Sequence, residues 1–470
     1  MEKVRISSYL NKIICVLILI CVILGNTIKL GDIRIAGVVV TLYRIGIPII
    51  SMFYIIKRII NKKWVQYFAH RMHRIYIIIF AIWILYGSIL LFTSEYVVLH
   101  DGLKEIINLI LGVMTIYCFT ECCTTKDDVA FLIKTLKIIT TVLCVIALQE
   151  MFFGVHFSTS KYQNIHSLHD LYEMVLVALT SGKIFPVTSI FYGVNDFAAF
   201  ITIFAPLFFI DKNMIFRDKV LNSIMFTIIA LLLALNDANV CLIALMITII
   251  FMMFIKKINI CSVGYFADVF FVQQYMSKWI YNGITYIEKY VKEKEIIKVP
   301  LMSGRLLMDA GGIDDVASVS EVLNAQMLTA EKGYGSLYSR YLLLLDGLDI
   351  FLKSHFLGTG PASFTTYLRI NGHRSKYVNP HNWWIEILSQ YGIIVFISYM
   401  GMLLYIFAKN VQCYFKNNNF IILQCLCMLV AYVIASIAPS SFLGYGYQWI
   451  IIALEIISIE IFHKEINKDD

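Results

Sequence analysis

Two residues with reactive side chains, Arg340 and His381, stand at the two ends of one polar stretch of the chain. Arg340 lies in the segment 339–353, whose apolar residues recur on one helical face, and His381 stands directly before a long apolar run. Arginine binds phosphate through paired hydrogen bonds and keeps its charge. Histidine titrates near neutral pH and can accept a proton or contact an anion. The pair predicts catalysis on a phosphorylated substrate; the alternatives are a surface arginine and an interfacial polar histidine.

The chain between these two residues has a one-sided balance of charge. From 350 to 385 it contains no Asp or Glu, yet it carries Lys353, Arg369, Arg374 and Lys376. A soluble loop normally mixes both signs, so this stretch predicts a surface that attracts anions. We expect Arg369, Arg374 and Lys376 to contact the substrate.

Further polar residues lie at the ends of apolar segments, where they could line a cavity open to water. Asn382 and Glu386 follow His381 within two helical turns, and Asn195 stands at the start of another apolar segment. We expect all three to contact the substrate. For Asn195 the alternative is a helix cap.

The cysteines and histidines do not indicate a metal or a disulfide framework. The eleven cysteines include no CxxC pair, and many lie inside apolar runs. His166 and His169, three residues apart beside Asp170, could bind a metal, but no further ligand joins them in the sequence. We expect no metal and no cofactor.

The composition defines the class of protein that must position these residues. Hydrophobic residues make up 59% of the chain and charged residues 15%, and the mean hydropathy is +0.75. Soluble domains average about 45–50% apolar and about 25% charged residues. The chain is therefore predicted to be an all-α polytopic membrane protein. Its net charge of +7 reflects cytoplasmic Lys and Arg and does not indicate a nucleic-acid partner.

Apolar runs long enough to cross a bilayer were located by their length of about 17–25 residues. They lie near 10–28, 35–56, 75–93, 103–120, 129–152, 194–211, 219–236, 239–255, 383–408, 419–438 and 446–462. Basic clusters place both Lys256 and Lys409 in the cytoplasm, so the chain between them must cross the membrane an even number of times. Only the run 383–408 lies between them, so one more crossing is required. The segment 258–276 is the best candidate, ahead of a shorter run at 171–180.

The predicted organisation has about twelve transmembrane helices and both termini in the cytoplasm. Residues 1–276 hold helices one to nine, 277–382 form one large extracytoplasmic loop that itself contains helices, and 383–470 hold helices ten to twelve with a short cytoplasmic tail. The loop carries Arg340 and His381, so the expected chemistry takes place on the outer face of the membrane.

The order of motifs along the loop resembles a known family. An arginine lies eighteen residues before a Gly-x-Gly turn, and His-Asn-x-x-x-Glu followed by Gly-Ile then runs into a membrane span. The matching residues are Arg340, Gly358, Gly360, His381, Asn382, Glu386, Gly392 and Ile393. This pattern is similar to that of the O-antigen ligase and Wzy-type polysaccharide polymerase superfamily. The likeness is specific mainly from 336 to 393.

The resemblance implies a metal-independent glycosyltransferase in the plasma membrane of a bacterium. Such proteins take glycan from an undecaprenyl-pyrophosphate donor and transfer it to a sugar hydroxyl. By this resemblance Arg340 would bind the pyrophosphate, and His381 would contact the pyrophosphate or activate the acceptor hydroxyl. Three functions are open: a polymerase of repeat units, a ligase onto another acceptor, and a flippase. Because the expected charges gather outside rather than at mid-membrane, an enzyme is favoured. The chain is rich in Ile and Lys, which is typical of an A+T-rich bacterium. A bacterium of that kind without lipopolysaccharide would favour the polymerase over the ligase. The partners of a polymerase would be the bilayer, a flippase and a chain-length regulator.

Overall fold

The computed structural model describes residues 2–25, 29–35, 38–62, 64–163, 185–256, 260–276, 338–375, 377–441 and 443–466. Four features predicted above lie outside the described residues: Lys376, the histidine pair at 166 and 169, the alternative crossing at 171–180, and the greater part of the predicted outer loop.

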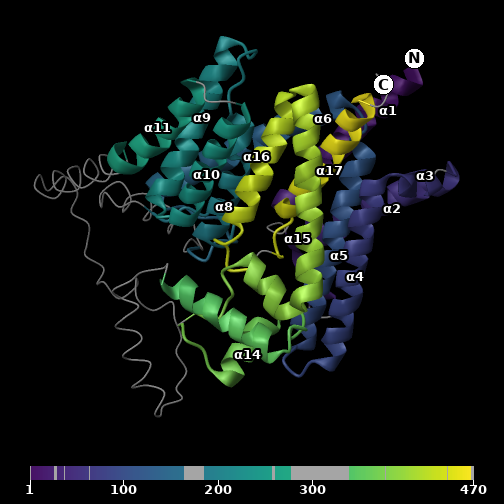
Figure 1. Ribbon diagram of the computed structural model, residues 1–470, viewed down its shortest axis with the longest axis vertical. Coiled ribbons are helices and arrows are strands. Elements are labelled where there is room, and N and C mark those ends of the chain that lie inside the picture. The colour runs from purple at the N-terminus through teal and green to yellow at the C-terminus, as the bar shows by residue number, and fades with distance from the viewer. Residues whose placement is uncertain are drawn as a thin grey trace, which may run out of the picture.

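The described chain is helical apart from one short hairpin (Figure 1). Its elements are α1 Glu2–Leu19, η1 Ile20–Leu24, β1 Lys29–Ile35, β2 Val38–Thr41, α2 Leu42–Ile60, α3 Trp64–Ala69, α4 Arg71–Thr93, α5 Leu99–Cys122, α6 Lys126–Phe153, α8 Val194–Phe204, η2 Ala205–Phe208, α9 Phe216–Leu235, α10 Asn239–Lys256, α11 Ile260–Phe271, η3 Val272–Met276, a helix at 338–353, α14 Ser363–Asn371, α15 Trp383–Asn417, α16 Phe420–Ala435 and α17 Tyr447–Ile466.

The helices pack as a bundle around α16 and α17. α16 packs against α10, α8 and α17, and α17 packs against α5 and α15. At one close approach a Cβ on Gly112 of α5 would lie 2.2 Å from the Trp449 ring of α17, so only glycine fits there. Large apolar side chains point outward on the peripheral helices, including Ile89 at 58%, Phe254 at 82% and Leu404 at 62% exposure. An apolar exterior of this extent is what a bilayer covers.

Six helices of the described chain are long and apolar enough to cross a membrane: α4, α5, α6, α9, α10 and α15. Three shorter apolar helices accompany them, at Tyr9–Leu24, Val194–Phe208 and Phe420–Ala435. The architecture is consistent with an all-helical membrane protein, while the number of twelve crossings stays a prediction. Within the proposed extra span at 258–276, the described residues 260–276 are helical, as α11 and η3, and Thr227 of α9 donates to the Asp268 carboxylate at 2.8 Å.

The predicted second span, 35–56, begins too early. The strands β1 (29–35) and β2 (38–41) pair antiparallel, and α2 starts only at Leu42, with the Thr41 hydroxyl accepting the Arg44 backbone N–H. Hydropathy does not distinguish an apolar strand from an apolar helix, and the β-branched run in 38–41 favours the strand. Arg44 therefore lies at a helix end, where its Nη1 donates to the Val39 carbonyl at 2.7 Å.

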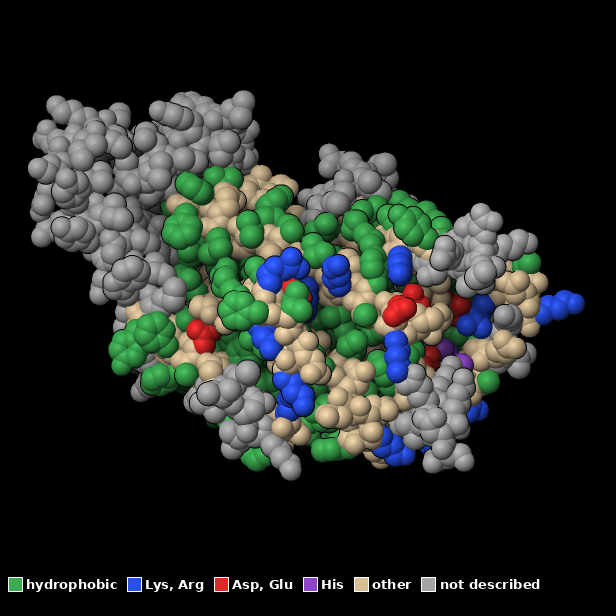
Figure 2. All heavy atoms as spheres, turned by 90° about the horizontal axis from the view of Figure 1, so that it is seen from above, with side chains coloured by type: hydrophobic (Ala, Val, Ile, Leu, Met, Phe, Trp, Pro, Cys, Tyr) green, Lys and Arg blue, Asp and Glu red, His purple; other side chains and the backbone are tan. Residues whose placement is uncertain are grey.

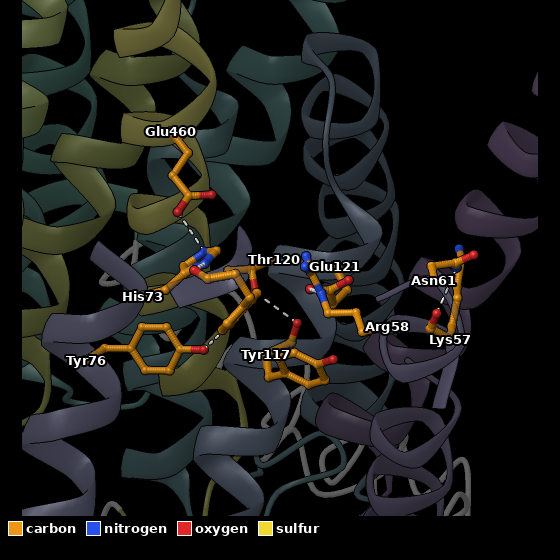
Figure 3. Close-up of polar contacts among 10 residues, drawn as sticks. Lys57, Arg58, Asn61, His73, Tyr76, Tyr117, Thr120, Glu121 and Glu460 are labelled. Carbon is orange, nitrogen blue, oxygen red and sulfur yellow. Dashed lines mark hydrogen bonds and ion pairs between the residues drawn. The ribbon is translucent and has the colours of Figure 1, made fainter. Parts of the chain in front are cut away.

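Both termini lie at one end of the bundle, and α14 lies at the opposite end (Figure 1). Viewed from the end with the termini, lysine and arginine side chains are spread across the face (Figure 2). Buried and half-buried ion pairs join helices near this end: Arg58 contacts Glu121 at 2.5 Å and His73 contacts Glu460 at 2.6 Å (Figure 3). That this face is the cytoplasmic one, as the basic clusters of the sequence predict, stays a prediction.

Candidate functional site

The candidate site is built on a break in α15. At Gly392 the backbone adopts φ 72° and ψ −173°, so Trp383–Asn417 is two helices joined at a kink rather than the single helix predicted from 383 to 408. Two carbonyl groups just before the break, those of Ser389 and Gln390, accept hydrogen bonds from outside the helix. Thr359 N–H donates to the Ser389 carbonyl at 3.0 Å, and Gly360 N–H donates to the Gln390 carbonyl at 2.8 Å. The turn after the 338–353 helix thus docks on α15 through its backbone.

The glycines of this turn serve close backbone approach. A Cβ on Gly358 would lie 2.5 Å from the Gln390 carbonyl oxygen, and a Cβ on Gly392 would lie 2.5 Å from the Leu357 carbonyl oxygen. All three glycines, including Gly360, have positive φ, which other residues adopt with strain. The Gly-x-Gly motif is therefore a structural joint between the polar segment and the membrane helix.

This joint fixes where His381 lies. The Asn382 side chain caps α15, with its Oδ1 accepting the Trp384 and Ile385 N–H groups at 3.0 and 3.4 Å. One residue earlier, His381 has φ 44° and its N–H donates to the Ser440 carbonyl at 3.2 Å. Its Nδ1 is buried without a hydrogen-bond partner among the described residues. Asn382 thus has a capping role, and His381 holds one ring nitrogen available.

Arg340 lies close enough to His381 to act on its charge. The pKa of His381 is lowered to about 4, because burial disfavours the imidazolium and the positive charge of Arg340 opposes it further. The pKa of Arg340 is itself lowered by burial, partly offset by Cys241 of α10 and by Tyr377. The structure therefore brings together two residues that are forty-one positions apart in the sequence.

A second cation, Lys161, was missed by the sequence reasoning. Its charge also lowers the pKa of His381. It follows α6 in a short polar turn, where its N–H donates to the Tyr192 carbonyl at 3.0 Å. Asn195 is half-buried in the first turn of α8, and its neighbour Asp196 accepts the Gly193 N–H at 3.0 Å as the cap of that helix. The only signal for Lys161 was its place in a polar interruption between apolar runs.

Glu386 is tied to the loop that follows α16. Its carboxylate is buried and accepts the Ser441 hydroxyl at 2.7 Å. The same loop supplies the Ser440 carbonyl that holds His381. Glu386 therefore links α15 to the loop after α16 that also holds the His381 backbone, and its expected contact with the substrate stays a prediction.

The one-sided charge expected for residues 350–385 is corrected by the neighbouring helix. Arg374 donates to Asp346 at 2.6 Å and to Asp349 at 3.3 Å, and Lys353 pairs with Asp349 at 3.1 Å. Both acids lie on the 338–353 helix and stand just before residues 350–385, the stretch that contains no Asp or Glu. Arg369 is exposed in the last turn of α14, with no ion pair among the described residues.

A cavity of about 380 Å³ opens beside Tyr447, whose hydroxyl donates to the Asp196 carbonyl at 3.4 Å. Hydroxyl groups and aromatic rings line it, from Ser158 and Thr159 on one side to Tyr192, Tyr445 and Tyr447 on the other. The rings of Tyr445 and Tyr447 stack with centroids 5.7 Å apart. A lining of hydroxyls and ring faces suits a polyhydroxylated ligand, because it offers both hydrogen bonds and apolar faces.

The fold and this site define a helical membrane protein with a cationic, histidine-containing site, formed by the 338–353 helix, the start of α15 and the polar turn after α6. No family model matches the chain. Over 135 residues it is 26% identical to the teichuronic acid biosynthesis protein TuaE of Bacillus subtilis (strain 168). The matching stretch covers 27% of this chain and 27% of TuaE, so the likeness spans about a quarter of that protein.

Proposed function

We propose that the protein is a membrane glycosyltransferase that polymerises undecaprenyl-pyrophosphate-linked repeat units into a surface polysaccharide. The similarity to TuaE supports a role in surface polysaccharide synthesis. The observation that carries the chemical part is the proximity of Arg340 to the buried His381, which has an unpartnered ring nitrogen. The loop motifs that resemble the ligase and polymerase superfamily point to the same residues.

In this mechanism Arg340 binds the pyrophosphate of the donor, assisted by Lys161. As the bond from the sugar carbon to the pyrophosphate oxygen breaks, the leaving oxygen keeps the electron pair, and a fixed cation stabilises the developing charge. His381 takes the proton of the acceptor hydroxyl as that oxygen bonds to the sugar carbon. The histidine is neutral at pH 7 because its pKa is about 4. Anion binding beside Arg340 offsets the cationic charge, which raises the pKa of His381 and makes it a better base.

The acceptor glycan has a place in the cavity lined by Ser158, Thr159, Tyr192 and Tyr445. Arg369 would attract the anionic donor from the exposed end of the 338–375 segment. Exposed charges act over about 8 Å at physiological ionic strength, so this contribution is salt-sensitive. Arg374 contributes less to such a field, because Asp346 and Asp349 already pair with it.

A ligase would use the same chemistry on a different acceptor, so the site residues do not separate the two enzymes. TuaE is named for teichuronic acid biosynthesis, and we take the similarity as support for the polymerase over the ligase. A flippase is disfavoured because Arg340 and His381 lie outside the long apolar helices. Arg340 belongs to the 338–353 helix, and His381 stands just before α15. In the proposed topology the site faces outward from the plasma membrane, both termini are cytoplasmic, and a flippase and a chain-length regulator are partners.

The test is the polymer length in cells that carry Arg340→Lys, His381→Ala or both, at matched membrane abundance. Arg340→Lys keeps the charge and loses the planar fork, so we expect at least a tenfold loss of long-chain product. Because the two residues act on one substrate, the double variant should be little worse than either single one. Matched controls are Arg217→Lys, at an exposed arginine of α9, and His100→Ala, at an exposed histidine of α5. Normal long-chain product from Arg340→Ala would refute the proposal.

A further inference from the structure

Three buried cysteines converge at the end of the bundle that carries the termini. Cys15 belongs to α1, Cys122 is the last residue of α5, and Cys123 follows it. Their three Sγ atoms all lie within 4.8 Å of one another, and those of Cys122 and Cys123 are 3.9 Å apart. Among the described residues this is the one group of three or more potential metal ligands that converges in this way. Other buried cysteines, such as Cys144, lie outside it.

The backbone explains why two consecutive cysteines point to one place. In a continuing helix successive side chains diverge by about 100°. α5 ends at Cys122, and Cys123 takes an extended conformation, φ −104° and ψ 96°, which turns its side chain back beside that of Cys122. The preceding residue, Glu121, is held by Arg58 of α2 at 2.5 Å (Figure 3), so the helix end is anchored. The Cys122 thiol also donates to the Asn11 carbonyl of α1 at 3.3 Å.

The spacing matches a three-coordinate metal ion. With metal–sulfur bonds of about 2.3 Å, three sulfurs around one ion lie about 4.0 Å apart. The Sγ atoms of Cys122 and Cys123 are 3.9 Å apart, and no two of the three Sγ atoms are more than 4.8 Å apart, so the observed distances are compatible with that value. No fourth ligand among the described residues joins the group. Asp128 uses its Oδ2 to cap α6 through the N–H groups of Thr124 and Thr125, at 3.1 and 2.9 Å.

We propose that Cys15, Cys122 and Cys123 bind one Cu(I) ion and thereby fasten α1 to α5. Sulfur ligands select soft ions, and three sulfurs without a fourth ligand favour Cu(I) over tetrahedral Zn(II). Each thiol that ligates releases its proton. The resulting negative charge lies beside the first turn of α6, where the positive end of the helix dipole favours it and the Asp128 carboxylate, already bound by the N–H groups of Thr124 and Thr125, opposes it.

The test uses the full-length protein in detergent, kept reduced and free of oxygen, with Cu(I) supplied from a bathocuproine disulfonate complex. We expect one Cu(I) per chain, bound at least a hundredfold more weakly by Cys15→Ser and by Cys122→Ser. Cys144→Ser, at a buried cysteine of α6 outside the group, is the matched control and should bind normally. X-ray absorption of the wild-type complex should show three sulfur neighbours at about 2.3 Å.

Unchanged Cu(I) binding by both Cys15→Ser and Cys122→Ser would overturn the proposal, as would two sulfur neighbours in the absorption spectrum. Stronger retention of Zn(II) than of Cu(I) would overturn the choice of ion. An intact mass 2 Da lower after mild oxidation, with no copper bound under reducing conditions, would show a disulfide pair in place of a metal site. If Cys15→Ser does not fold, as judged by gel filtration, the absorption spectrum of the wild type and the Cys123→Ser variant decide.

Discussion

Replacing Gly392 by alanine should undock the turn at 358–360 from α15. Gly392 has φ 72° and ψ −173°, a backbone conformation that is essentially restricted to glycine. The added methyl group would also lie 2.5 Å from the carbonyl oxygens of Phe356 and Leu357, and backbone atoms cannot move aside as a flexible side chain can. The turn must therefore shift away, although the substitution adds only one carbon atom.

The size of the effect follows from these contacts. The strained backbone costs about 2 kcal/mol. Displacing the turn breaks the hydrogen bonds from Thr359 to Ser389 and from Gly360 to Gln390, each worth about 1 kcal/mol. The sum is about 4 kcal/mol against docking, which corresponds to about a thousandfold in the docking equilibrium.

Hydrogen exchange measured by mass spectrometry reads this equilibrium locally. The amides of Thr359 and Gly360, which donate across the joint, should exchange about a thousandfold faster in the variant, in proportion to the loss of docking. The matched control is Gly401→Ala in the same helix, where a Cβ meets nothing within 4 Å. That change should stabilise α15 by about 0.5–1 kcal/mol. Equal exchange at these amides in the two variants would refute the reasoning.

Further predictions concern charge. Because burial and then Arg340 lower the pKa of His381 to about 4, against 6.5 for the free group, stability is full above pH 6.5 and falls by about 3 kcal/mol towards pH 4. His381→Gln should flatten this dependence in thermal melts, and a pH profile equal to that of the wild type would contradict it. Arg340→Gln should raise the pKa of His381 towards 6.5, which leaves the onset of the acid destabilisation near pH 6.5 but makes the total loss of stability towards pH 4 smaller than in the wild type; an unchanged loss would show the two groups to be uncoupled. Arg374→Gln leaves Asp346 buried without its cation and should cost about 2 kcal/mol, whereas Asp349→Asn should cost under about 1 kcal/mol, and equal melting temperatures would count against this account.

The class of protein and the helical nature of most segments could be predicted from the sequence. Composition and hydropathy are sums over neighbouring residues, and a bilayer selects on such sums, so the runs at 75–93, 103–120 and 129–152 are helices close to their predicted bounds. The sequence also singled out Arg340 and His381 as candidates, because both stand beside apolar runs, and their roles stay a prediction.

What only the tertiary structure decided depends on groups that are distant in the sequence. The break at Gly392 exists because the turn at 358–360 takes up the carbonyls of Ser389 and Gln390, so nothing within the apolar run announces it. Arg374 is neutralised by acids of a helix more than twenty residues earlier, and charge pairing acts through space. The β1–β2 hairpin could not be predicted from hydropathy either, because an apolar strand and an apolar helix have the same mean hydropathy. Lys161 joins Arg340 and His381 only through folding, because electrostatic reach is measured in ångströms and not in positions along the chain.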